Sequence, residues 1–549
     1  MSRYQGRYVI VGPPGTGKTT FLAKQVEQLL NAYADAPIDE ATSPIIACSL
    51  TRTAAAEFAQ RRPGLPRNAI GTLHALAYRL AGDRRRVAEA HLDEWNKYAP
   101  EYAINARAAS DDDEDAGNDA YDMFEDDGTS FYAEYQLQRA RCTDRATWPS
   151  TVAAFAQRWE DWKGATGYID YTDMLERALK VNAVPLDARV LLVDEAQDMS
   201  ALEWRLIAHW EKMLDAVFIA GDPWQALYTW RGAAPRTMEE VPQDRRRVLH
   251  QSYRVPRAVH AAAMRWIRNL SWYSPIEYNP RPDDGRVQCC EATLRRAYGV
   301  PRLIEELLRE NHDVMLLATC GYMLAPVCAA LRENGIWFAN KWRVKSGAWN
   351  PIRPGGTYWK LRDILSHAPW WPVANERREH WTATHLHMLA QLVRAEMFAR
   401  GVKDEVEGWA KDKAMCDAPL PVATLRNLFA IGAYDEMTTA LAGGWNAIAR
   451  WLDRYILPSK RSSITYPLAV LRRNPEQRSP RVWVGTVHSV KGGEADAVVL
   501  WPDLSRAGME QWATRNRDSI VHTVYVGMTR ARQTLVLGEP SGAYCVDFA

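Results

Sequence analysis

The sequence has almost no net charge and no long apolar run. Its 549 residues hold 68 Lys and Arg against 67 Asp and Glu, a formal net charge of +1. No apolar run approaches the ~20 residues of a membrane span. The apolar stretch near the N-terminus, Tyr8–Val11, is shorter than the roughly 7–15 residues of a secretory signal. We therefore expect a cytoplasmic protein without a membrane partner.

Cysteine pairs suited to metal binding are also missing. The eight cysteines contain no Cys-x-x-Cys spacing, although Cys289 and Cys290 are adjacent and Cys320 and Cys328 lie eight apart. This pattern favours reduced, buried thiols over zinc or iron–sulfur ligation.

The small net charge hides an uneven distribution. Residues 111–127 hold ten acids and neither Lys nor Arg, so that 68 bases face 57 acids in the rest of the chain. Such an acidic tract is typical of a solvated loop; a nucleic-acid mimic that guards a basic groove is the alternative. A nucleic-acid partner is therefore not excluded.

Short β-branched runs predict an α/β fold with parallel sheets. The length predicts three or four structural units, and helix-like segments such as Thr20–Leu30 separate many of the runs, as in α/β folds. The expected strands are Tyr8–Val11, Ile45–Ser49, Val190–Val193, Ala216–Ala220, Val314–Ala318, Val482–Thr486, Ala497–Leu500 and Thr534–Leu537.

Two stretches break the alternation of strands and helices. Gly82–Thr166 is charge-rich and predicted to be helical, and Ser346–Pro475 is helix-like in places such as Glu376–Arg400. Ten of the 23 Trp fall between Trp337 and Trp451. They are expected to build a subdomain core; a duplex or partner surface is the alternative, since Trp is favoured at binding hot spots.

A phosphate-binding loop follows the first predicted strand. Residues 12–19 fit G-x-x-x-x-G-K-[ST] and open a helix-like segment, the context that confirms this motif. Backbone N–H groups of the loop and the helix N-terminus would bind phosphate oxygens. Lys18 would reach the β and γ phosphates, and the Thr19 hydroxyl would bind Mg²⁺. The predicted nucleotide-binding residues here are Gly12, Pro13, Gly15, Thr16, Gly17, Lys18, Thr19 and Thr20.

A pair of carboxylates ends another apolar strand. Asp194 and Glu195 follow Val190–Val193, so they would face the crevice at the carboxyl edge of the sheet. Asp194 is predicted to hold Mg²⁺. Glu195 is predicted to orient and polarise the attacking water, because phosphoryl transfer depends on positioning.

Further motif-like segments follow along the chain in the same order as in a known family, and the chain resembles the superfamily 1A helicases of the UvrD/Rep/PcrA type. The resemblance runs from Gly12 to Arg532 and includes the Asp-Glu-Ala-Gln-Asp form of the acidic motif. Beyond the two motifs above, the matching segments are Ser49–Glu57 (motif Ia), Gly71–His74, Ile169–Leu175, Gly221–Ala233 (motif III), Gln251–Arg254 (motif IV), Thr486–Glu494 (motif V) and Val524–Ala531 (motif VI).

The resemblance implies a fold of two RecA-like motor domains, each with a parallel sheet and a mainly helical insert. Residues 1–81 and 167–240 would form motor domain 1A, with insert 1B at 82–166. Residues 241–345 and 476–549 would form motor domain 2A, with a reduced, Trp-rich insert 2B at 346–475. The implied activity is ATP-dependent movement, 3′ to 5′, on single-stranded DNA, coupled to duplex unwinding.

The resemblance also assigns roles to single residues. Gln225 would sense the γ-phosphate, and Arg254 and Arg530 would act as arginine fingers, for which a planar, always charged guanidinium is suited. Tyr253 would stack on adenine and Glu494 would bind the ribose. The implied DNA contacts are Thr51, Arg52, Thr72 and His74 on the backbone, and Tyr228, Trp230 and His488 at the bases.

The sequence departs from the family pattern at several places. Only eleven residues precede Gly12, too few to align Gln5 with the adenine-reading Q motif, and Thr20 stands where relatives carry an arginine. Leu50 replaces a base-stacking aromatic. Trp224 in motif III is atypical and would either stack on DNA or be buried against a neighbour. Only 17 residues follow Arg532, so a shortened pin and weak strand separation are expected, and no nuclease domain.

Two alternative functions remain open from the sequence. One is a single-strand-dependent ATPase that translocates and strips proteins with little unwinding, and the other is a non-enzymatic nucleic-acid-binding assembly protein. The expected cofactors are ATP and Mg²⁺. The expected partners are single-stranded DNA, single/double-strand junctions and unidentified repair, replication or recombination proteins. A monomer or weak oligomer, nucleoid-associated in a bacterial or virus-infected cell, is expected.

Overall fold

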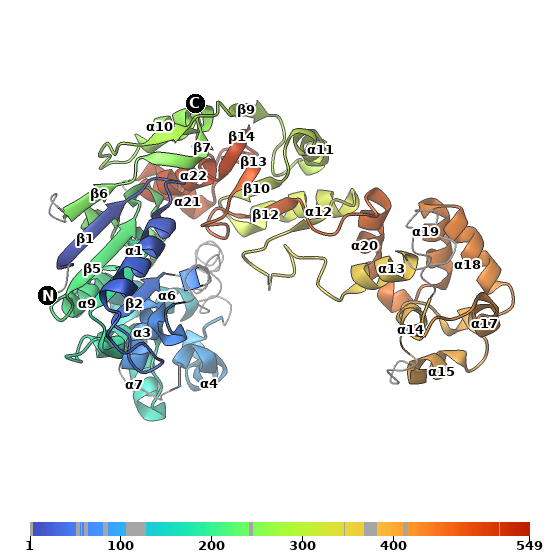
Figure 1. Ribbon diagram of the computed structural model, residues 1–549, viewed down its shortest axis with the longest axis horizontal. Helices are drawn as coiled ribbons and strands as arrows, with labels where there is room; N and C mark the ends of the chain where they lie inside the picture. Colours follow the sequence, from blue (N-terminus) through green and yellow to red (C-terminus); the bar gives the residue numbers. More distant parts are fainter. Residues whose placement is uncertain are drawn as a thin grey trace. The chain divides into compact units, whose positions relative to one another are not determined.

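The computed structural model of the chain (Figure 1) contains two compact units. It describes residues 4–50, 55, 58–59, 64–80, 86–105, 128–240, 245–344, 346–366, 381–409, 416, 418–514 and 517–548. The first unit comprises Met1–Arg296, Leu307–Leu324 and Gly485–Ala549, and the second comprises Ala297–Glu306 and Ala325–Val484. Each unit is described on its own.

A six-stranded parallel sheet organises the N-terminal part of the first unit. Its strand order is β3-β2-β4-β5-β1-β6. The central strands are apolar and almost entirely buried, as expected for a parallel sheet covered on both faces. The strands are β1 (Gly6–Val11), β2 (Ile45–Ser49), β3 (Ile70–Thr72), β4 (Val190–Val193), β5 (Ala216–Gly221) and β6 (Arg246–Val248).

A second parallel sheet follows in the same unit. Its strands β10 (Val314–Ala318), β13 (Ala495–Leu500), β14 (Ala531–Gly538) and β9 (Arg286–Cys290) pair in this order. The same unit also contains a short parallel pair, β7 (Gln251–Pro256) with β8 (Asn279–Arg281). The expected α/β fold with two parallel sheets is confirmed.

Helices connect these strands. Those of the first unit are α1 (Lys18–Ala32), α3 (Leu73–Leu80), α4 (Leu92–Tyr98), α6 (Gly128–Ala140), α7 (Ser150–Thr166), α8 (Tyr171–Ala178), α9 (Ala201–Glu211), α10 (Arg257–Ile267), α21 (Arg506–Ala513) and α22 (Asp518–Met528). Helix α11 (Val300–Glu310) lies where the chain passes from the second unit back into the first. Among the described helices, none has both the length and the apolar character that a bilayer crossing demands.

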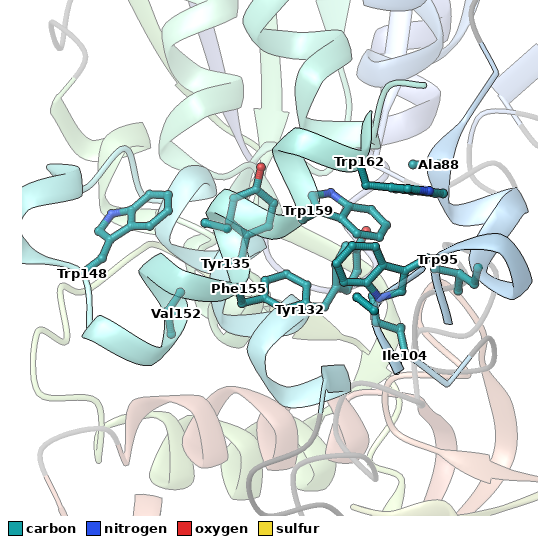
Figure 2. Close-up of a cluster of buried hydrophobic side chains, with 13 residues drawn as sticks. Ala88, Trp95, Ile104, Tyr132, Tyr135, Trp148, Val152, Phe155, Trp159 and Trp162 are labelled. Carbon is teal, nitrogen blue, oxygen red and sulfur yellow. The ribbon is translucent and has the colours of Figure 1, made fainter. Parts of the chain in front are cut away.

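An aromatic core holds the described part of the predicted insert 1B together (Figure 2). Trp95, Phe155 and Trp159 are completely buried. The rings of Trp95 and Trp159 meet edge to face at 4.9 Å between centroids, the geometry that aromatic pairs prefer. Tryptophans therefore build a buried core in this first region, where the sequence did not predict one. The acidic tract at 111–127 lies outside the described residues.

A buried ionic cluster joins three helices of this region. Asp170 caps the N-terminus of α8 and is completely buried. Its carboxylate accepts hydrogen bonds from Arg139 Nη1 of α6 at 2.9 Å and from Lys163 Nζ of α7 at 2.6 Å. Asp173 and Glu176 of α8 accept from the same Arg139 guanidinium. We call these five residues the Asp170 cluster.

The second unit is mainly helical. Its helices are α12 (Ala325–Glu333), α13 (Thr357–Ser366), α14 (Ala383–Ala390), α15 (Val402–Trp409), α17 (Val422–Leu428), α18 (Ala433–Ala442), α19 (Trp445–Tyr455) and α20 (Arg461–Arg473). Strand β11 (Phe338–Ala339) pairs with the start of β12 (Val482–Thr486). The predicted insert 346–475 lies inside this unit, and the division into four subdomains stays a prediction.

Two expectations about the second insert need correction. Within Glu376–Arg400 the described helix ends at Ala390, because backbone groups beyond it pair elsewhere: Arg394 N–H donates to the Tyr455 carbonyl at 2.7 Å. Residues 376–380 lie outside the described residues. Among the described tryptophans from Trp337 to Trp451, which were expected to build the core, Trp337, Trp381 and Trp451 are buried, while Trp342, Trp349, Trp359 and Trp409 are only partly buried.

The eight cysteines form no disulfide bonds, and they are not uniformly buried. Cys48, Cys320 and Cys328 are buried and Cys289 is exposed, while the other four are intermediate. The expectation of buried thiols is therefore correct for three residues and wrong for Cys289. In the part of the chain that the structure describes, no cluster of three or more His, Cys, Asp or Glu is arranged to hold a metal ion.

Candidate nucleotide and nucleic-acid site

The loop between β1 and α1 has the backbone of a phosphate cradle. Gly15 and Gly17 adopt positive φ angles of 74° and 82°, which glycine reaches without a steric penalty. Lys18 Nζ donates to the Gly12 carbonyl at 2.6 Å and Thr16 Oγ1 donates to the Pro13 carbonyl at 2.8 Å. These bonds curl the loop around the ammonium group at the N-terminus of α1, where an anion is favoured.

Thr19 and Asp194 meet across the sheet edge where Mg²⁺ was expected. Thr19 Oγ1 donates to Asp194 Oδ2 at 3.0 Å. Burial and the neighbouring Glu195 raise the pKa of Asp194 to about 6, so a cation here would stabilise the charged carboxylate. Magnesium commonly takes one or two protein oxygens and completes its shell with phosphate and water oxygens. The two residues fit such an ion.

Glu195 holds an unusual backbone conformation beside Asp194. Its φ of 56° places a non-glycine residue in the left-handed region, a strain that proteins concentrate at functional sites. Its Oε2 accepts from Gln197 Nε2 at 2.5 Å and lies 3.6 Å from Lys491 Nζ. Burial would raise the pKa of Glu195, but Lys491 and Lys18 outweigh it and lower that pKa to about 2. The side chain is therefore an ionised acceptor, able to orient a water molecule.

Gln225 and Arg530 are in direct contact, although they lie 305 residues apart in the chain. Arg530 Nη2 donates to Gln225 Oε1 at 2.8 Å, and Gln225 Nε2 donates to Asp222 Oδ2 at 2.6 Å. The guanidinium is 1% exposed, and its burial together with Arg254 lowers the pKa of Arg530 to about 9. An anion such as a phosphate would offset this unfavourable burial of positive charge.

The segment expected to bind the base and ribose lies against the phosphate loop. Tyr253 N–H donates to the Gly15 carbonyl at 2.9 Å, while its side chain is 73% exposed. Arg254 Nε donates to Glu494 Oε2 at 2.5 Å. The structure thus leaves the Tyr253 ring open to a base and pairs Glu494 with Arg254 where a ribose contact was predicted. Thr20 is exposed at the start of α1.

The residues predicted to meet DNA are brought together only in part. Tyr228 lies 6.1 Å from His488 and 6.4 Å from Trp230 between ring centroids. Tyr228 is 1% and His488 4% exposed, so neither ring presents an open face in this arrangement. Trp230 is partly buried.

Two of the four predicted backbone contacts, Thr72 and His74, lie on one short described segment. Thr72 ends β3, and its Oγ1 accepts from Ala75 N at the start of α3. His74 Nδ1 is 3.8 Å from Glu203. Thr51 and Arg52 lie outside the described residues, as does most of the segment assigned to motif Ia.

Sequence reasoning assigned no role to several residues that complete this site. Lys491 forms ion pairs with Asp198 and Glu195, and Asp222 holds Gln225. Tyr278 Oη and Ser252 Oγ both donate to the Pro14 carbonyl, at 3.0 and 2.9 Å. Lys491, Asp222 and Ser252 lie inside motifs that were recognised, so each motif could have directed attention to them. Tyr278 lies outside all of them and has no local signal.

Fold and site together define a P-loop NTPase with two RecA-like sheets. The residues predicted to bind the nucleotide come from both ends of the chain. Residues 1–246 match the sequence model of the UvrD/REP helicase N-terminal domain, and residues 481–537 match that of the UvrD-like helicase C-terminal domain. Together the two matches cover more than half of the chain. The chain belongs to the UvrD-like helicase family.

Curated relatives agree with this assignment at low identity. A protein of Mycoplasma pneumoniae named as a probable DNA helicase is 26% identical over 286 residues, which are 47% of this chain and 52% of the relative. The ATP-dependent DNA helicase UvrD2 of Mycobacterium tuberculosis is 26% identical over 265 residues, 42% of this chain and 36% of the relative. The chain thus matches about half or less of the length of these relatives.

Proposed function

We propose that the chain is an ATP-dependent motor that moves 3′ to 5′ on single-stranded DNA and couples ATP hydrolysis to duplex unwinding. The observation that carries this proposal is the Arg530–Gln225 hydrogen bond of 2.8 Å. It joins motif VI to motif III in the same unit as the phosphate loop, Asp194 and Glu195. The names of the relatives support ATP-dependent helicase activity and a DNA substrate.

Each group has a distinct role in the proposed hydrolysis. Lys18 and the loop amides would bind the β and γ phosphates, and Thr19 and Asp194 would hold Mg²⁺, which would supply positive charge to neutralise the phosphates. Glu195 orients the attacking water, since its low pKa keeps it ionised. Gln225 contacts the γ-phosphate, and Arg530 with Arg254 stabilises the charge on the transferring group. Opening and closing of the nucleotide site would move the DNA in steps.

The proposal extends to partners and to DNA contacts. Thr51, Arg52, Thr72 and His74 would hold the backbone, which gives affinity without sequence reading. Stacking of bases on Trp230 is sequence-tolerant, and Tyr228 and His488 would join it only after their rings become exposed. Single/double-strand junctions and proteins of DNA repair, replication or recombination are the proposed partners.

A tailed-duplex assay tests activity and polarity together. ATP hydrolysis should be stimulated by single-stranded DNA, and only the duplex with a 3′ tail should be unwound. Glu195→Gln removes the charge that orients water and should lower kcat for hydrolysis by roughly 10²–10⁴-fold. An RNA strand of the same sequence serves as the substrate control.

The other outcomes separate the remaining functions. Equal unwinding from both tails would refute the polarity. Stimulated hydrolysis without strand separation from either tail would favour the protein-stripping translocase. No hydrolysis with single strands present would favour the non-enzymatic assembly protein.

Adenine stacking on Tyr253 gives a separate prediction. Because 73% of this side chain is exposed and base–aromatic stacking is worth about 1–3 kcal/mol, Tyr253→Ala should weaken ATP binding by roughly 5–150-fold. Tyr253→Phe keeps the ring and should bind ATP like the wild type. Titration with ATP followed by calorimetry measures both variants. Unchanged affinity of Tyr253→Ala would show that the base binds elsewhere.

A further inference from the structure

Trp224 is completely buried, although it lies in a short turn beyond the end of a strand. It belongs to the 3-10 turn Pro223–Gln225 that follows β5. Its ring stacks on Tyr273 at 5.7 Å between centroids and meets Tyr525 of α22 edge to face at 6.0 Å. Of the two interpretations left open by the sequence, the structure therefore supports burial against a neighbour and leaves no ring face for a DNA base.

The backbone of the same residue is tied to the same helix. His522 Nδ1 of α22 donates to the Trp224 carbonyl at 2.7 Å, which requires the tautomer with the proton on Nδ1. His522 is 1% exposed, and its burial lowers the pKa to about 4. The imidazole is therefore neutral at physiological pH and acts as a fixed donor. The turn is held on α22 by its side chain and its main chain at once.

The turn and the helix each lead directly to one of the two groups that meet at the γ-phosphate site. Gln225 follows Trp224 in the chain, and its amide is held by Asp222 at 2.6 Å. Arg530 follows the end of α22 and donates back to the Val526 carbonyl of that helix at 3.0 Å. A shift of the turn along α22 would therefore change the Gln225–Arg530 contact.

We propose that Trp224 and His522 are positioning residues. They hold the motif III turn against α22 and thereby fix the position of Gln225 relative to Arg530. Neither residue is among those proposed to bind the phosphates, so they act only through Gln225 and Arg530. The proposal rests on the proposed ATPase function and deepens it. It also gives a physical reason for a tryptophan at a position where the family pattern does not predict one.

Steady-state kinetics with single-stranded DNA present provides the first measurement. Displacements of about 1 Å at a catalytic group cost up to ~10²-fold in rate, so Trp224→Leu and His522→Leu should lower kcat by roughly 10–100-fold. The KM for ATP should stay within about twofold, because the phosphate loop and Tyr253 are untouched. His522→Asn places an amide donor near the Nδ1 position and should restore most of kcat.

A double-mutant cycle distinguishes positioning from a general loss of packing. With Gln225→Ala, the contact to Arg530 is already absent, so adding Trp224→Leu should lower kcat little further, while the loss of thermal stability should remain. If Trp224→Leu does not fold, Trp224→Phe takes its place. This change removes no hydrogen bond, since Trp224 Nε1 has no partner among the described residues.

Trp266 of α10 offers a matched control that packs against the same helix α22. It is buried, stacks on Trp512 at 5.7 Å, and donates from Nε1 to the Val521 carbonyl of α22 at 2.9 Å. It contacts α22 one residue away from His522, so Trp266→Leu should lower stability and leave kcat unchanged. Equal loss of kcat in this control, or additive losses in the cycle, would overturn the positioning role alone. Absence of ATP hydrolysis by the wild type would instead overturn the proposed function, and this role with it.

Discussion

Replacing Arg530 by alanine should lower kcat for ATP hydrolysis by roughly 10³–10⁵-fold, the range that arginine fingers contribute to phosphoryl transfer. The guanidinium is almost completely buried and reaches Gln225 at 2.8 Å. Because burial lowers its pKa to about 9, the charge is present at neutral pH but poorly solvated. The negative charge that develops on the transferring phosphoryl group would then interact with it strongly.

The Arg530 prediction separates binding from chemistry. Single-turnover hydrolysis gives the rate of the chemical step, and equilibrium titration gives ATP affinity, which should change far less than kcat. Arg530→Lys keeps a charge but loses the planar fork and should recover only part of the rate. Arg506→Ala is the control, because Arg506 lies on the neighbouring α21 and, within the described residues, its ion pair is an exposed one with Glu510. A fall in kcat of less than tenfold for Arg530→Ala would contradict its role.

Local sequence signals were sufficient for the sheets and the phosphate loop. Strands β2, β4, β10 and β12 begin and end at the predicted residues, because each is a short apolar run in which every residue is suited to burial between layers. The phosphate loop was predictable for a similar reason, since its glycines and lysine act within eight consecutive residues. The long helix expected at Glu376–Arg400 fails where backbone pairing with Tyr455, 61 residues away from Arg394, replaces the helical hydrogen bonds.

Contacts between distant segments were predictable only where both residues lie in recognised motifs. The motifs identified Gln225 and Arg530, and the structure supplies their contact. The burial of Tyr228 and His488 was not predictable, because an aromatic in motif III or V carries no signal for the solvent exposure of its ring. The hydrogen bond from His522 to the Trp224 carbonyl joins residues that are 298 apart in the chain. The sequence around either residue does not predict this contact. The sequence does not show how loops that follow strands of the first sheet, such as the turn after β5, pack against helices beside the second sheet, such as α22.

The Asp170 cluster carries the largest expected effect on stability. Asp170 is completely buried and accepts hydrogen bonds from Arg139, Lys163, the Trp159 indole and the Asp173 amide. Asp170→Asn keeps the shape but removes the negative charge, which leaves two buried cations with too few anions. Breaking a buried ion pair in this way costs about 3–5 kcal/mol, and the free energy of unfolding should fall by that amount.

Urea unfolding of the full chain, followed by tryptophan fluorescence, measures this loss, because Trp95, Trp159 and Trp162 lie in the adjoining core. Asp144→Asn is the matched control: Asp144 also caps a helical turn, accepting from Ala146 N at 3.1 Å, but it is exposed. Its replacement should cost less than about 1 kcal/mol, since Asn caps as well as Asp.

Arg139 and Lys163 lower the pKa of Asp170 below its ordinary value. The ionised Asp170 carboxylate therefore contributes its full stabilisation to the folded state above its pKa in the unfolded chain, about 3.9. This contribution is lost as the pH falls through the lower pKa of Asp170 in the folded protein. The difference between wild type and Asp170→Asn should accordingly be constant from pH 6 to 8 and shrink in acid; a difference that instead grows in acid would show that the cluster does not stabilise the ionised carboxylate.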